Sequence, residues 1–158
     1  MTPPKESLEE RANRLSKKYQ LTQSDFDAEC INGKGDLTKV VQSTLADLLP
    51  DEHFVITESV TSDSQRYMAT VSYQGKKLVD VYADTYADFL PEDFWQRFEA
   101  IPVAMNSSKR FYFINPILLG QVFWCICGTE DNVKAAKADG LPVVLPGEDF
   151  MEADVSEF

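Results

Sequence analysis

Basic residues are scarce in this chain relative to acidic ones. Its 158 residues include 15 Lys+Arg and 26 Asp+Glu, which gives a formal net charge of −11. Nucleic-acid binding depends on Lys and Arg that displace counterions from phosphates, so direct nucleic-acid binding is disfavoured. Anionic membranes are disfavoured for the same reason. The complementary partner is a basic protein, although acidity also keeps a protein soluble without any partner.

Long apolar runs are also missing. No stretch approaches the roughly 20 apolar residues that a membrane helix needs. The first residues, "MTPPKESLEERANRL", are polar and charged, whereas a secretory signal requires an apolar segment there. We therefore expect no membrane association and a cytoplasmic location.

Histidine and cysteine are too few for a standard zinc site. The chain has one histidine, His53, and three cysteines, Cys30, Cys125 and Cys127, without two well-spaced ligand pairs. It also has no G-x-S-x-G turn and no glycine-rich phosphate loop. We expect neither a metal ion nor a cofactor, and no enzymatic activity.

The segment "QVFWCICG" is the one place where two cysteines lie close together. On a strand, Cys125 and Cys127 share one face, while Trp124 and Ile126 share the other. Both faces are apolar, which is typical of a strand covered on both sides. We interpret these cysteines as core residues, with a redox role as the alternative.

Three helices are predicted in the first third of the chain. Ser7 and Glu10 have capping-box spacing at the start of the first helix. A short second helix is expected from Thr22 to about Ile31. Asp36 is expected to cap a third helix, whose apolar residues follow helical spacing until Pro50 ends it.

The rest of the chain is predicted to alternate strands with helices. Gln74-Gly75 is a tight-turn signal between two strand-like runs. The expected elements are strands near 54–60, 66–73 and 76–83, a helix from Pro91, strands near 109–115 and 121–128, a helix capped by Thr129, and a short edge strand in "PVVLP". The predicted fold class is α+β: a single domain over 1–146, in which one mostly antiparallel sheet of about five strands packs against helices. The order is ααα-βββ-α-ββ-α(β). The acidic tail 147–158 is expected to be flexible or ordered only on a partner.

The segment "VDVYADTYADFLPEDFW" is the main candidate site. Its acids and tyrosines have only Arg97, at some distance, to neutralise them. A carboxylate pair for glycoside hydrolysis, a calcium loop and a protein interface are the functional alternatives, beside a plain solvated junction. The calcium pattern fails because Tyr and Ala occupy the intervening positions. The predicted partner-binding residues are Asp80, Tyr82, Asp84, Tyr86, Asp88, Glu92 and Asp93.

A second, weaker indication is the apolar connector "NPILLG". Ile117, Leu118 and Leu119 lie in a loop that is expected to be polar. They either fold inward as core, the favoured interpretation, or form an exposed patch for association.

The favoured function is that of a non-catalytic acidic protein that neutralises a basic effector protein by occluding its active or substrate-binding site. In size, acidity, cytoplasmic character and lack of catalytic apparatus, the chain resembles bacterial immunity proteins that inhibit toxins. The alternative is a homodimeric binding protein, because the order of strands and helices is similar to that of class I type III secretion chaperones. A small carboxylate-dependent hydrolase is the third hypothesis.

Overall fold

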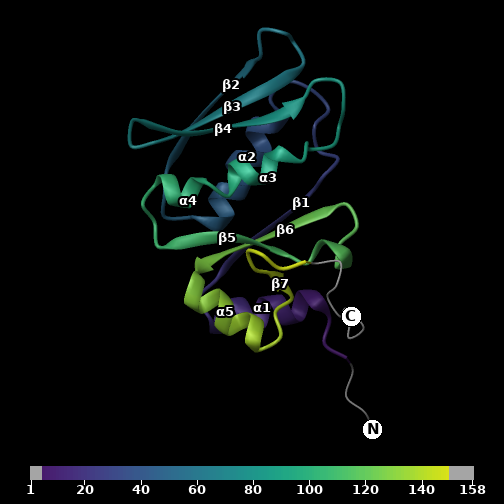
Figure 1. Ribbon diagram of the computed structural model, residues 1–158, viewed down its shortest axis with the longest axis vertical. Helices are drawn as coiled ribbons and strands as arrows, with labels where there is room; N and C mark the ends of the chain where they lie inside the picture. The colour runs from purple at the N-terminus through teal and green to yellow at the C-terminus, as the bar shows by residue number, and fades with distance from the viewer. Residues whose placement is uncertain (1–4, 150–158) are drawn as a thin grey trace.

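The chain folds into four layers of secondary structure, which Figure 1 shows stacked from top to bottom. A three-stranded sheet lies on helices α2, α3 and α4, these lie on a four-stranded sheet, and α1 and α5 cover the far side of that sheet. The computed structural model describes residues 5–149, without the side chain of Ile117. The elements are α1 Leu8–Lys18, β1 Thr22–Asp27, α2 Asp36–Leu48, β2 Phe54–Val60, β3 Arg66–Tyr73, β4 Lys76–Asp84, α3 Asp93–Phe98, α4 Ile101–Ala104, β5 Lys109–Ile114, the 3-10 helix η1 Pro116–Leu118, β6 Val122–Thr129, α5 Glu130–Ala138 and β7 Val143–Val144. The predicted α+β class is confirmed.

The predicted hairpin and meander are present in the three-stranded sheet. Its order is β2-β3-β4 and every pair is antiparallel. Gln74 and Gly75 form the turn between β3 and β4 with φ of 52° and 79°. Two positive φ values are typical of the tight turns that match strand twist.

We expected one sheet of about five strands, but the strands form two separate sheets. A separate antiparallel sheet has the order β1-β6-β5-β7. It contains β5 and β6, which were predicted near 109–115 and 121–128, and the short strand predicted in "PVVLP". The helical layer lies between the sheets, so β2, β3 and β4 cannot pair with the others (Figure 1).

The predicted helix over 22–31 is wrong, because residues 22–27 form β1 and pair with β6. Thr22, Ser24 and Phe26 alternate with polar residues and face the helical layer. The Thr22 hydroxyl donates to the Leu48 carbonyl at 2.6 Å. The spacing of two thus places these side chains against α2, while the backbone pairs with the edge of β6.

Two hydrophobic clusters form the core, one on each side of the four-stranded sheet. Cys125 and Cys127 are 0% and 1% exposed and belong to the cluster between the sheets. Trp124 and Ile126 pack in the second cluster, against α1 and α5. The interpretation of "QVFWCICG" as a strand covered on both faces is therefore confirmed.

The caps of α1 and α5 agree with the sequence signals, whereas α2 begins one residue earlier than its predicted cap allows and α3 begins at Asp93, not at Pro91. Ser7 and Glu10 form the predicted capping box of α1, and the Thr129 hydroxyl accepts from the Asn132 amide at the start of α5. The N-cap of α2 is Gly35, with φ of 94°, and Asp36 is the first helical residue. A left-handed backbone is required at this cap, which favours glycine.

Only the start of the predicted acidic tail lies within the described residues. The Glu148 carboxylate pairs with Lys137 at 3.1 Å and accepts from the Leu145 amide at 2.7 Å. This ties Glu148 to α5 and to the end of β7. Residues 150–158 lie outside the described range. Within 5–149, no helix has the length and apolar character needed to cross a membrane.

Candidate functional site

The structure divides the seven predicted site residues into two groups. One group belongs to an ion-pair network on the outward side of β4 and at the start of α3; the other lies on an exposed loop between these elements. Val81 and Ala83 point into the core, so their strand neighbours point outward. The network contains Asp80, Tyr82, Asp84 and Asp93, and the exposed group contains Tyr86, Asp88 and Glu92.

Arg66 on β3 is the centre of the network. Its two terminal nitrogens contact the two carboxylate oxygens of Asp93 at 2.6 and 3.1 Å. Its Nε lies 3.3 Å from Asp84 Oδ1. Arg97 adds a second, longer ion pair to Asp93, at 3.5 Å. The expectation that only distant Arg97 neutralises these acids is therefore wrong.

Tyr82 is enclosed by the same arginines. The guanidinium carbons of Arg66 and Arg97 lie 4.6 and 4.8 Å from the centroid of its ring. Both lie within the distance at which a cation is attracted to an aromatic face. Tyr82 therefore supports the network, and much of its ring surface is already covered.

Asp80 is held by its own partners on the sheet. Lys77 Nζ lies 2.6 Å from one carboxylate oxygen, and the Thr70 hydroxyl donates to the other at 2.6 Å. Burial pushes the pKa of Asp80 upward, but the hydrogen bonds from Lys77 and Thr70 outweigh it and the pKa lies below its usual value.

The pKa shifts in the network oppose general-acid chemistry. The hydrogen bonds that Arg66 donates to Asp93 lower the pKa of Asp93 and raise the pKa of Arg66. A carboxylic general acid needs a pKa raised towards the working pH. Asp80 and Asp93 are shifted in the other direction, which favours a structural role for both over a catalytic one.

The loop 85–92 carries the exposed group. Tyr86 is 73% exposed and Phe89 is 44% exposed, while Asp88 and Glu92 are also exposed. Single exposed aromatic residues are common on protein surfaces, but a contiguous exposed apolar patch marks an interaction site. Phe89 was missed by the sequence reasoning, although it lies in the same segment as the predicted residues.

Backbone hydrogen bonds join this loop to two others at one end of the molecule. The Ile31 amide donates to the Asp88 carbonyl at 3.1 Å, and the Leu90 amide donates to the Ala28 carbonyl at 3.0 Å. The Ala28 amide donates to the Gln121 carbonyl at 2.7 Å. Segments 27–33, 85–92 and 115–122, far apart in sequence, are thus held side by side.

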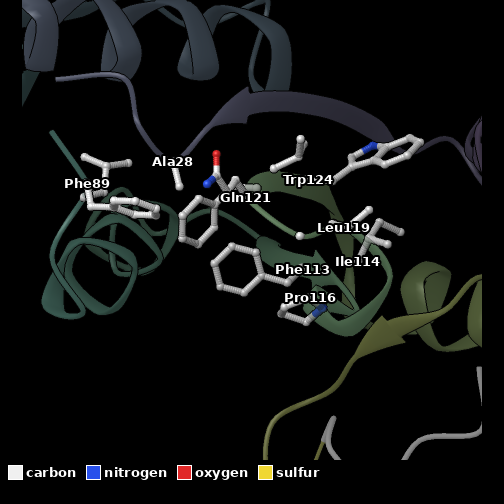
Figure 2. A pocket seen from close by; sticks show the side chains of 12 residues that line it. Ala28, Phe89, Phe113, Ile114, Pro116, Leu119, Gln121 and Trp124 are labelled. Carbon is white, nitrogen blue, oxygen red and sulfur yellow. The ribbon is translucent and has the colours of Figure 1, made fainter. Parts of the chain in front are cut away.

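An apolar pocket of about 170 Å³ opens among these segments (Figure 2). Figure 2 shows Phe89 at one end and Trp124 at the other, with the Phe113 ring and Pro116 between them. None of the described lining residues is charged. The "NPILLG" connector contributes Pro116 and Leu119 to this pocket, and Leu119 also packs against the second core cluster. Leu119 is thus partly buried against the core, as the favoured interpretation expects, and it also lines the pocket.

Acids adjoin the lining residues of this pocket in sequence. Exposed Asp27 and Glu29 flank the lining residue Ala28, and Asp88 precedes the lining residue Phe89. Glu29 also accepts a hydrogen bond from Gln121 Nε2 at 3.1 Å. We call the exposed side chains of the two segments that contribute Ala28 and Phe89 to the pocket the loop-end surface: Asp27, Glu29, Tyr86, Asp88, Phe89 and Glu92.

Cys30 is partly buried, and Cys125 and Cys127 are buried. Burial raises the pKa of the Cys30 and Cys127 thiols to about 11, and that of the Cys125 thiol well above its usual value. Such thiols hold little nucleophilic thiolate at neutral pH. His53 is exposed at the junction of α2 and β2. Within the described part of the chain, no three His, Cys, Asp or Glu side chains group as metal ligands.

Comparison with known proteins assigns no family. Family models, curated proteins and solved structures were all searched, and none of them matches this chain.

Proposed function

We propose that this chain is a non-catalytic binding protein that captures a basic effector protein and neutralises it by occlusion. The observation that carries the proposal is the loop-end surface, where exposed Tyr86 and Phe89 lie in an acidic loop that contributes Phe89 to an uncovered apolar pocket. Aromatic anchors inside a charged rim are typical of protein interfaces. The formal net charge of −11 supports a cationic partner, because it steers such a partner during encounter.

The ion-pair network has a supporting role in this proposal. Arg66 contacts Asp84 at the end of β4 and Asp93 at the start of α3, so it joins the two ends of the loop 85–92. A loop held in one shape loses less conformational entropy on binding. We therefore assign direct partner contact to Tyr86, Asp88 and Glu92 among the predicted residues. Asp84 and Asp93 hold the ends of the loop through Arg66, Tyr82 packs against Arg66, and Asp80 is bound on the sheet by Lys77 and Thr70.

Occlusion needs no bond chemistry in this chain. Carboxylates of the loop-end surface would occupy the cationic groove that the partner uses for its own anionic substrate. The tyrosine and phenylalanine would add rigid contact area at a low entropic cost. The expected effect on the effector is competitive inhibition, with fast association at low salt and slower association at high salt.

The test is affinity capture from an extract of the organism that makes the protein, using the wild type and two charge-matched double variants. Asp88→Lys/Glu92→Lys alters the loop-end surface; Glu9→Lys/Asp51→Lys makes the same charge change at exposed positions elsewhere. We expect one stoichiometric basic partner on the wild type and on the control. On the loop variant we expect at least roughly tenfold weaker binding, because two favourable charge contacts become repulsive.

Salt dependence and activity complete the experiment. The complex is expected to weaken as ionic strength rises, and the captured effector is expected to lose activity when the purified protein is added. Absence of a stoichiometric basic partner would contradict the proposal. Equal capture by both double variants would place the interface elsewhere on the molecule.

A further inference from the structure

The apolar pocket of the loop-end surface has the size and chemistry to accept one side chain from a partner. From its geometry we infer that the partner presents an extended segment in which a leucine-like aliphatic residue, flanked by lysine or arginine, inserts into this pocket. This inference rests on the proposed function and adds to it the chemistry of the recognised segment.

The pocket offers carbon atoms to its occupant. Phe89, Phe113, Pro116 and Leu119 contribute apolar surface to its lining. The indole Nε1 of Trp124 donates to Gln23 Oε1 at 3.0 Å. Gln23 does not line the pocket, so this polar group of Trp124 is already paired away from the occupant. Gln121 is the one described lining residue with a side-chain amide, so an occupant that brought a polar group among the other lining residues would lose its hydration without a replacement hydrogen bond from their carbon atoms.

The volume sets the size of that occupant. About 170 Å³ is available, and an apolar cavity of roughly 150 Å³ is large enough to hold benzene. One Leu, Ile or Met side chain therefore fits, whereas a tryptophan would not fit completely. Burying such a side chain strengthens binding by roughly tenfold to a hundredfold over a polar one of similar length.

The rim determines the charge of the flanking residues. Asp27 and Glu29 adjoin the lining residue Ala28, Glu29 accepts from the lining residue Gln121 at 3.1 Å, and Asp88 adjoins the lining residue Phe89. Cations on both sides of the inserted residue would meet these carboxylates. A second copy of this chain is a poor occupant, because it carries the same net charge of −11 and the same acidic rim.

Peptide probes separate the anchor from the charge. The first probe is a labelled peptide with a central leucine and two arginines on each side; the second has serine in place of leucine; the third keeps leucine between neutral residues. Binding to the full chain is followed by fluorescence polarisation. We expect the leucine–arginine peptide to bind roughly tenfold or more tightly than either of the others.

Variants of the protein locate the effect. Phe89→Ala removes an exposed wall of the pocket, and Ala28→Leu fills the pocket from a lining position. Both are expected to remove most of the preference for leucine over serine. Val55→Ala, at an exposed position on β2, serves as the control and is expected to keep that preference. Because Phe89 is partly exposed, its variant provides the test even if Ala28→Leu fails to fold.

The outcomes distinguish this inference from the proposed function. Equal binding of the leucine and serine peptides, both weakened by Asp88→Lys/Glu92→Lys, would overturn the anchor and leave the acidic capture surface intact. Equal binding of the charged and neutral leucine peptides would overturn the basic flanks. A leucine preference that survives Phe89→Ala and Ala28→Leu would exclude this pocket, and so would binding of none of the peptides.

Discussion

At the scale of single residues, Arg66 does more than any acid to shape the candidate site. It forms a two-pronged ion pair with Asp93, a second ion pair with Asp84 and a stacking contact with Tyr82. The planar guanidinium allows all three, because its fork matches a carboxylate while its face lies on a ring. Lysine could not reproduce this arrangement.

The ion pair between Arg66 and Asp93 predicts a specific pH dependence. Arg66 lowers the pKa of Asp93 below its ordinary value of 3.8. The unfolded chain therefore binds a proton at this position before the folded chain does. The stabilisation is present above about pH 4, the unfolded value, and is lost as the pH falls through the folded pKa.

Asp93→Asn is expected to lower the free energy of unfolding at pH 7 by about 1 kcal/mol, at the upper end for a partly exposed pair. The variant should also lose part of the decline in stability below pH 4. Urea unfolding between pH 2.5 and 7 measures both effects, with Asp51→Asn in an exposed turn as the control. An unchanged pH profile in Asp93→Asn would show that this carboxylate does not contribute to acid unfolding.

At the scale of secondary-structure elements, one side chain of β2 caps a helix in the layer below. Glu58 accepts from the Gly35 amide at 2.6 Å and from the Thr38 amide at 3.0 Å, and also from the Thr38 hydroxyl. A carboxylate at this helix end satisfies free amides and interacts favourably with the helix dipole. It also ties the three-stranded sheet to α2.

Glu58→Ala is expected to destabilise the protein by about 1–2 kcal/mol, because it leaves the amides at the start of α2 without their acceptor. Ser59→Ala, the next residue on the exposed side of the same strand, is the control and should change stability little. Urea unfolding curves with unchanged slopes measure the difference. Equal midpoints for the two variants would contradict a capping role for Glu58.

At the scale of the whole molecule, the two core clusters share the four-stranded sheet and each contains one tryptophan. Trp95 packs in the cluster between the sheets, and Trp124 packs in the cluster under α1 and α5. Because β6 contributes side chains to both clusters, we expect the layers to unfold together.

Two single-tryptophan variants test that cooperativity. Trp124→Phe leaves Trp95 to report on the first cluster, and Trp95→Phe leaves Trp124 to report on the second. In each variant, the unfolding midpoint from fluorescence is expected to coincide with the midpoint from far-ultraviolet circular dichroism. Trp124→Phe should also lower stability by about 1 kcal/mol, through the lost hydrogen bond to Gln23. Midpoints that differ between the probes would show that the clusters unfold separately.

Local signals in the sequence were sufficient for much of the fold. The capping box at Ser7, the turn at Gln74-Gly75 and the two apolar faces around Cys125 each depend on residues close together in the chain. Such signals predict structure correctly because their physical cause is local: a helix cap, a turn residue with positive φ, or the two-residue alternation of side chains along a strand. They predicted α1, the hairpin and the buried strand, and the segment containing Tyr86, Asp88 and Glu92.

The partners of the predicted residues were decided only by the tertiary structure. A two-residue turn that pairs Tyr73 with Lys76 would place Arg66 opposite Ala83, but an irregularity between Val71 and Ser72 moves it opposite Asp84. A shift of one residue changes which face a side chain lies on, and it creates the network around Arg66. The strand at 22–27 and the pocket also depend on contacts between distant segments. The sequence alone thus determined which residues carry charge and aromatic surface at this end of the molecule, whereas long-range pairing decided which of them are neutralised and which are exposed.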